Sequence, residues 1–308
     1  MSNPEIKFVS NKDIDREKWD QCIVDSPFGI VYAMSWYLDR ICPKWDALIS
    51  GDYLYVMPLV NNKKYGISYI YQPFFSQQLG VFSSLPIKPA IVDQFLNTIP
   101  KQFRLTDMNL NIGNTIQSIN FGFKHHTTYH LSLISGIDLI RSNYNSNTKR
   151  NIQKAIRNKI NISHVNDIDR FMEFSQFNLK EKSPGIKLKH YQALRKIISY
   201  ALAHQLGEIY GAWDSNQNLV ASVFFVNSNQ DCIYLAATSN QSGIEQNAMF
   251  LLVDTFIQNN FGKKQILDFE GSDISGIARF YAGFGATPKT YYSVHQNQLP
   301  KLIRIFKK

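Results

Sequence analysis

The order in which strands and helices are predicted along the chain constrains the fold more than any other feature of the sequence. Alternating apolar residues indicate strands, and apolar residues recurring every three or four positions indicate helices. In the first half the patterns predict a strand, two helices, a run of strands, a helix and closing strands. The second half repeats this order, with an antiparallel three-strand run over 208–238, a helix over 246–259, a strand over 265–269 and a short helix over 275–281. The order of elements therefore predicts two similar modules, although the two halves of the chain share no convincing sequence repeat.

The boundary between the modules falls best at 136–147, where polar residues cluster before a new helix. A length of 308 residues also favours two domains, at about 150 residues per domain. We therefore predict an α+β protein with an N-terminal domain over 1–140 and a C-terminal domain over 141–308. Each is expected to hold a mixed, largely antiparallel sheet flanked by helices.

Composition excludes several classes of protein. Hydrophobic residues make up 44% and charged residues 19% of the chain, which suits a buried core rather than a disordered or coiled-coil protein. No apolar run reaches the roughly 18–20 residues that span a bilayer, and Met1–Ser10 lacks the pattern of a secretory signal, so we expect a cytoplasmic protein. Three scattered cysteines argue against a disulfide framework. The net charge of +9 favours polyanionic partners.

Three motifs of the second half occur in a characteristic order. The basic segment Asn147–Arg157 comes first, then Tyr234–Ser239 with Gly243 and Asn247–Leu252, and last Leu267–Ser272 followed by Gly276–Ala286. Together they resemble the basic helix, the donor-site strand, loop and helix, and the C-terminal signature of FemAB-like acyltransferases of the GNAT (GCN5-related N-acetyltransferase) superfamily. The first half is similar in element order and in a weak match at 128–133.

The resemblance implies two GNAT-like domains that transfer an acyl or aminoacyl group from a thioester or an aminoacyl-tRNA to an amine, with the first domain degenerate as a donor site. It places the donor, acyl-CoA in GNAT enzymes, against strand 231–238 and the following loop. Small residues before a helix leave backbone N–H groups for phosphate, although only Gly243 remains of the usual glycine and arginine pattern. An ordinary strand-to-helix turn would use the same residues. The implied donor-binding residues are Ala237, Thr238, Ser239, Asn240, Gln241, Ser242, Gly243, Ile244 and Asn247.

Acyl transfer to an amine requires a base for the ammonium proton, donors for the oxyanion and an acid for the leaving group. By resemblance, Tyr281 is the candidate acid. Fem enzymes that use aminoacyl-tRNA typically carry a Phe-Lys pair where this chain has Phe280 and Tyr281, so a thioester donor fits better. Asp268 and Glu270 are predicted to share one face of a strand, and Glu270, at its end, is the candidate base or amine anchor. The alternative for Tyr281 is an aromatic residue that only caps the core. The alternative for Asp268 and Glu270 is a structural salt bridge.

A basic stripe is predicted on the helix of residues 147–159. Arg150, Lys154 and Arg157 recur at helical spacing, with Lys149 beside them. The stripe suits the phosphates of tRNA or of an anionic precursor, and a solvated face is the alternative. The tail adds Lys301, Arg304, Lys307 and Lys308.

Three histidines, His125, His126 and His130, suggest a metal cluster at first sight. On a strand His126 and His130 would share a face but stand about 13 Å apart, too far for one ion. We therefore predict no metal site and expect these histidines at the surface or at an interface.

The sequence as a whole predicts an N-acyltransferase that uses an acyl-CoA donor. Its acceptor would be an amine of a small metabolite or of a cell-envelope precursor such as a peptidoglycan precursor. One alternative is an aminoacyl-tRNA-dependent transferase of the peptidoglycan-bridge type. Another is a non-catalytic protein that binds tRNA or another polyanion on the same fold.

Overall fold

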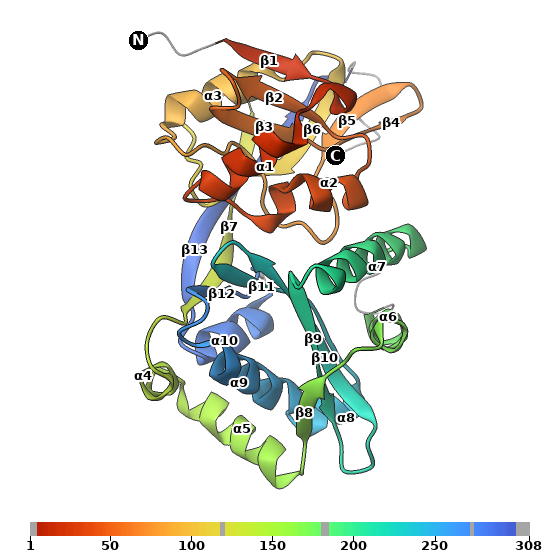
Figure 1. The fold of residues 1–308 in the computed structure, drawn as a ribbon, viewed down its shortest axis with the longest axis vertical. Helices are drawn as coiled ribbons and strands as arrows, with labels where there is room; N and C mark the ends of the chain where they lie inside the picture. Colours follow the sequence, from red (N-terminus) through yellow and green to blue (C-terminus); the bar gives the residue numbers. More distant parts are fainter. Residues whose placement is uncertain (1–4, 118–120, 180–184, 272–273, 300–308) are drawn as a thin grey trace. The chain divides into compact units, whose positions relative to one another are not determined.

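The computed structural model describes residues 5–117, 121–179, 185–271 and 274–299, and it divides into two compact units (Figure 1). The first unit comprises Met1–His126 and Thr290–Lys308, and the second comprises Thr127–Lys289. The chain passes between the units twice, within strands β7 (Gly122–Ser132) and β13 (Thr287–Asn297). The domains 1–140 and 141–308 stay a prediction, and the compact units differ from them because the residues from Thr290 return to the first unit. The four basic residues predicted in the tail, Lys301, Arg304, Lys307 and Lys308, lie outside the described residues.

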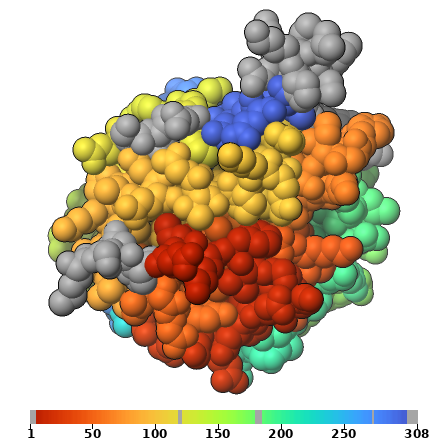
Figure 2. Space-filling model, turned by 90° about the horizontal axis from the view of Figure 1, so that it is seen from above, coloured from red at the N-terminus to blue at the C-terminus, as the bar shows by residue number. Residues whose placement is uncertain are grey.

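The first unit holds two groups of strands with helices between them along the chain. Its elements are β1 (Ile6–Val9), α1 (Arg16–Asp25), α2 (Ser35–Ile41), β2 (Asp46–Ser50), β3 (Tyr55–Leu59), β4 (Asn61–Lys64), β5 (Ile67–Tyr71), α3 (Pro89–Thr98) and β6 (Phe103–Asn109). Strands β1, β2 and β3 form an antiparallel sheet, and a second group runs in the order β4, β5, β6 and β13. Figure 2 shows the red N-terminal strand lying along the gold segment of α3 and β6, where the rings of Phe8 and Phe103 are 6.4 Å apart.

The core of the first unit is built on aromatic side chains. Trp19 and Trp45 are fully buried with ring centroids 4.8 Å apart, and the Trp19 indole donates a hydrogen bond to the Ala33 carbonyl. Helix α1 begins where the Asp15 carboxylate accepts from the N–H groups of Glu17 and Lys18, which satisfies two donors that a helix start leaves open. The buried Trp19 indole thus finds a partner within this unit, as buried polar atoms require.

The second unit is one sheet with helices on both faces (Figure 1). Its elements are α4 (Ile137–Ser142), α5 (Ser146–Arg157), β8 (Asn161–His164), α6 (Ile168–Leu179), α7 (Leu188–Ala203), β9 (Gly207–Trp213), β10 (Leu219–Ser228), β11 (Asp231–Ser239), α8 (Gln241–Glu245), α9 (Ala248–Asn260), β12 (Ile266–Asp268) and α10 (Ser275–Gly283). The strand order is β7, β12, β11, β10, β9, β8, and only the pair β11 and β12 is parallel. Helices α5, α9 and α10 cover one face, and α6 and α7 cover the other. The prediction of an α+β fold with largely antiparallel sheets is confirmed.

The core beneath α9 is built on large aromatic side chains of the second unit. The rings of Phe225 on β10 and Phe256 on α9 stack at 3.5 Å, and Phe269 and Phe284 are fully buried beside them. This packing fixes α9 on the sheet, and with it the positions of α8 and α10 around the end of β11. Of the helices that the structure describes, none combines the length and the apolar character that crossing a bilayer requires.

Candidate functional site

The sheet of the second unit opens between its two parallel strands. Strands β11 and β12 are paired only at Cys232 with Leu267 and at Ile233 with Asp268. Strand β12 ends at Asp268, whereas β11 continues to Ser239. The chain after β12 then turns away to form α10, so the second half of β11 borders an opening rather than a neighbouring parallel strand.

A pocket of about 360 Å³ lies at this opening, among β11, α8, α9 and α10. Its volume is within the range of small-molecule sites, and no lining side chain carries a charge. Every lining residue belongs to the second unit. The lining residues are Tyr234, Ala237, Ser239, Gly243, Ile244, Asn247, Met249, Phe250, Gly276, Ile277, Phe280 and Tyr281.

The turn after β11 is held by its own hydrogen bonds. Asn240 caps α8 with its side-chain oxygen, which accepts from the Gly243 N–H at 2.8 Å, and the Asn240 N–H donates to the Val220 carbonyl at 3.1 Å. A Cβ on Gly243 would lie 2.1 Å from that same carbonyl oxygen, so close packing on β10 requires glycine here. The Gly243 N–H is therefore engaged within the protein, and phosphate binding by other N–H groups of the loop stays a prediction.

Asn247 connects the pocket to helix α5. Its backbone has the left-handed conformation, with φ of 58°, and it precedes α9 without a capping bond from its side chain. Instead its Nδ2 donates to the Asn151 Oδ1 of α5 at 3.2 Å. Within the first turn of α9 the Phe250 N–H donates to the Asn247 carbonyl at 3.1 Å. A helix start favours negative charge beside it.

The structure brings together part of the predicted donor set. Ala237, Ser239, Gly243, Ile244 and Asn247 line the pocket. Thr238 is buried on the opposite face of β11, as alternation along a strand requires. Asn240, Gln241 and Ser242 form the cap and first turn of α8 and are not among the lining residues.

Tyr281 lines the pocket, and most of its side chain is buried. Only 8% of the residue is exposed, its ring stacks on Phe269 at 4.8 Å, and Tyr234 meets it edge-on at 6.0 Å. Burial, followed by the nearby charges of Glu270 and Asp268, raises the pKa of its hydroxyl. Among the described residues none hydrogen-bonds that hydroxyl group, so a protonated O–H is available to a ligand.

Glu270 lies beyond the end of β12, so strand alternation does not relate it to Asp268. Its backbone has φ of 56°, and its N–H donates to the Asp268 Oδ1 at 2.9 Å. The predicted strand over 265–269 is therefore shorter than expected. The next residue must be glycine because a Cβ on Gly271 would lie 1.7 Å from the Thr127 carbonyl oxygen. Glu270 is close enough to raise the pKa of Tyr281 but does not line the pocket.

Asp268 is the centre of a buried polar cluster that the sequence did not indicate. It accepts a hydrogen bond from the Thr128 hydroxyl at 2.7 Å, and its Oδ2 lies 3.3 Å from the His130 Nε2. The pairing of β7 with β12 brings His130 opposite Asp268. The His130 side chain is only 13% exposed, so it does not lie at the open surface, and the alternative position at an interface stays a prediction. The parts of the chain that the structure describes contain no group of three or more His, Cys, Asp or Glu able to hold a metal ion.

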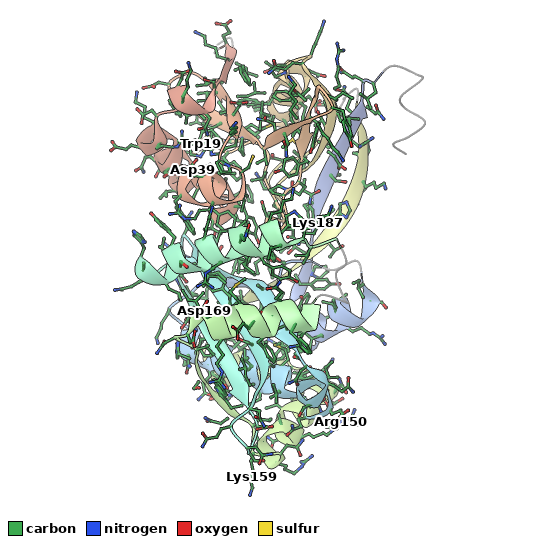
Figure 3. All side chains as sticks on the ribbon, turned by 90° about the vertical axis from the view of Figure 1, so that its right-hand side faces the viewer. Trp19, Asp39, Arg150, Lys159, Asp169 and Lys187 are labelled. Carbon is green, nitrogen blue, oxygen red and sulfur yellow. The ribbon has the colours of Figure 1, made fainter. Side chains whose placement is uncertain are left out.

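The four predicted cations of α5 are all exposed. Lys149 donates from its ammonium to the Ser142 carbonyl at 3.2 Å, and Arg150 approaches the Asn147 amide oxygen at 3.5 Å. No carboxylate of the described residues lies within ion-pair distance of Lys149, Arg150, Lys154 or Arg157. Figure 3 shows Arg150 on the outside of the second unit. These charges are therefore available to an anionic partner.

Comparison with solved structures identifies the architecture, while no family model and no curated protein matches the sequence. FemX is similar over 99% of this chain and 100% of its own, with a TM-score of 0.68 and 10% identity. The chain has the FemX fold. L-PGS from Bacillus licheniformis is similar over 95% of both chains, with a TM-score of 0.54 and 11% identity. A tandem GNAT protein from the clavulanic acid biosynthesis pathway matches over 96% of this chain and 100% of its own, with a TM-score of 0.54 and 10% identity.

The resemblance to FemAB-like proteins of the GNAT superfamily is thus confirmed for the fold. Within this FemX-like fold, the pocket lies at the end of β11, and a donor site there stays a prediction of the sequence motifs. Sequence reasoning missed Tyr234, Met249, Phe250 and Ile277, because apolar and aromatic residues at helical or strand spacing look like ordinary core. The signal that could have found them is their position beside the predicted loop.

Proposed function

We propose that the protein is an N-acyltransferase that takes an acyl group from an acyl-CoA thioester bound in the pocket and transfers it to an amine. The observation that carries this proposal is that five of the predicted donor residues and Tyr281 surround one pocket. A transferase on the GNAT fold accords with the architecture that the solved neighbours share. The uncharged pocket suits the apolar arm and thioester of the donor.

The residues around the pocket suit the chemistry of aminolysis. The neutral amine attacks the thioester carbonyl, a C–N bond forms, and the C–S bond breaks as the tetrahedral intermediate collapses. Tyr281, kept protonated by its raised pKa, donates its proton to the departing sulfur and regains one from solvent. The proton lost by the amine goes to a carboxylate, for which Glu270 is the candidate.

The acceptor that we propose is an amine of a cell-envelope precursor or of a small metabolite. This follows from the resemblance to FemAB-like enzymes. The apolar lining of the pocket suits the donor, and we propose that the acceptor amine binds on another surface.

Ligand-dependent stabilisation tests the donor. Saturating coenzyme A or acetyl-CoA should raise the melting temperature, because a ligand at 100 times its Kd adds about 2.7 kcal/mol to the stability of the folded state. The Ala237→Phe variant, which fills the pocket, should lose the shift, whereas Ala90→Phe on the exposed side of α3 should keep it. Absence of any shift in the unmodified protein would contradict a coenzyme A donor.

A second candidate is a protein that uses aminoacyl-tRNA, or that holds tRNA or another polyanion without catalysis. The observation that favours it is the set of exposed cations on α5. Tyr281 stands where tRNA-dependent Fem enzymes typically have lysine, and this favours the thioester donor.

A further inference from the structure

Helix α5 runs antiparallel to α9. Just before α5, the Arg141 guanidinium pairs with the Asp254 carboxylate, and Tyr144 lies near that carboxylate. Seven residues further along α5, Asn151 bonds to Asn247, which lies seven residues before Asp254. The second half of α5 therefore extends past the start of α9 (Figure 1), where Asn247, Met249 and Phe250 line the pocket.

The four cations of α5 differ in their position relative to this pocket. With about 100° and 1.5 Å per residue, Lys154 lies about 60° around the helix from Asn151 and about 4.5 Å further along it. Arg150 is adjacent to Asn151, about 100° around. Lys149 is on the far side of the helix, about 160° away, where its ammonium bonds to Ser142. Arg157 lies about 9 Å beyond Asn151.

The phosphate groups of the donor are negatively charged, and the pocket has no positively charged side chain to bind them. None of the lining side chains is cationic, and the Gly243 N–H that the loop would offer is bonded to Asn240. Arg150 is next to Asn151, the contact of Asn247, and Lys154 is the cation that lies nearest to Asn151 around the helix. No described carboxylate pairs with either cation. A guanidinium and an ammonium group make strong, charge-assisted hydrogen bonds to phosphate.

We propose that Arg150 and Lys154 bind the phosphate groups at the nucleotide end of the donor, in place of the arginine that the loop lacks. Lys149 and Arg157 lie outside this site. The inference rests on the proposed function, since it assigns the second half of the same donor site. It divides the basic stripe into two cations that bind the donor and two that do not.

Binding of coenzyme A and of pantetheine, which lacks the nucleotide and its phosphates, tests the assignment. The affinity of the full chain for coenzyme A is measured by titration calorimetry, and pantetheine binding by ligand-observed NMR. The Arg150→Glu and Lys154→Glu variants should each weaken coenzyme A binding about tenfold or more, since hydrogen bonds to charged groups are among the stronger ones. Pantetheine binding should stay unchanged.

Lys149→Glu is the matched control, because it makes the same change of charge on the same helix. Circular dichroism and the melting temperature establish that each variant is folded. Unchanged coenzyme A affinity in both Arg150→Glu and Lys154→Glu would overturn the inference and leave the proposed function intact. Equal losses in Lys149→Glu and Arg157→Glu would also overturn it, and tRNA binding that weakens with salt would then favour a diffuse polyanion surface. Failure of the unmodified protein to bind either coenzyme A or pantetheine would overturn the proposed function itself.

Discussion

At the scale of single residues, Tyr281 is the group on which the proposed chemistry depends most. Its ring is clamped between Phe269 and Tyr234, while its hydroxyl group has no hydrogen-bond partner among the described residues. Because Tyr281 lines the pocket, its hydroxyl group can be reached by solvent or by a ligand. The ring contributes to packing, and the hydroxyl group is left for function.

Removing only the hydroxyl group of Tyr281 separates these two roles. We expect Tyr281→Phe to lower kcat by about a hundredfold, the lower end of the contribution of a general acid. Release of coenzyme A thiol with a saturating amine acceptor measures the rate. The melting temperature should change little, because the variant keeps the ring and breaks no described hydrogen bond. Unchanged turnover would remove Tyr281 from the mechanism.

The sequence could predict contacts between residues that are close together along the chain, but not contacts between residues far apart along it. Ala237, Ser239 and Asn247 line the pocket as expected, because a strand, a loop and a helix that follow one another stay together in space. The contact between Thr128 and Asp268 spans 140 positions and depends on the pairing of β7 with β12. No periodicity reveals such a pairing, and the cluster around Asp268 therefore emerges only from the fold.

At the scale of elements, the sequence predicts helices and strands better than their ends. The helix expected over 246–259 is observed as α9 over Ala248–Asn260, preceded by the separate short helix α8. The break lies at Asn247, whose left-handed backbone ends one helix and begins the next. Asparagine tolerates this conformation better than most residues, but nothing in the local pattern requires it here.

The junction of α4 with α9 depends on one buried carboxylate. Asp254 is 5% exposed and accepts hydrogen bonds from the Arg141 guanidinium at 3.0 and 2.7 Å. Removing the arginine leaves a buried charge without its main partner, so Arg141→Ala should lower the free energy of unfolding by about 2–3 kcal/mol. Arg195→Ala is the matched control, because Arg195 and Asp169 form an exposed ion pair whose loss should cost less than about 1 kcal/mol.

Urea denaturation of both variants measures this difference. Arg141→Met, which keeps much of the apolar stem, should be destabilised nearly as much as Arg141→Ala if the charge is responsible. Equal stability of Arg141→Ala and Arg195→Ala would show that Asp254 finds other partners or water.

At the scale of the whole molecule, buried tyrosines are distributed unequally between the two units. Burial is the main cause of a raised hydroxyl pKa for five tyrosines of the second unit, Tyr144, Tyr191, Tyr210, Tyr234 and Tyr281. In the first unit the same shift is found for Tyr71. The second unit thus carries most of the described tyrosines whose ionisation opposes folding.

This asymmetry predicts that alkali destabilises the second unit more than the first. A tyrosine with a raised pKa in the folded state keeps its proton above pH 10, while the unfolded chain loses it. The stability that such a group contributes is therefore present below the unfolded pKa of about 10 and is lost as pH rises, by up to about 1.4 kcal/mol per pH unit for each tyrosine. Hydrogen exchange, corrected for its intrinsic rate and followed by mass spectrometry at pH 8 and pH 10.5, should show protection lost first in peptides of Thr127–Lys289. Tyr281→Phe should reduce that loss, because it removes one titrating group, and earlier opening of the first unit would contradict the prediction.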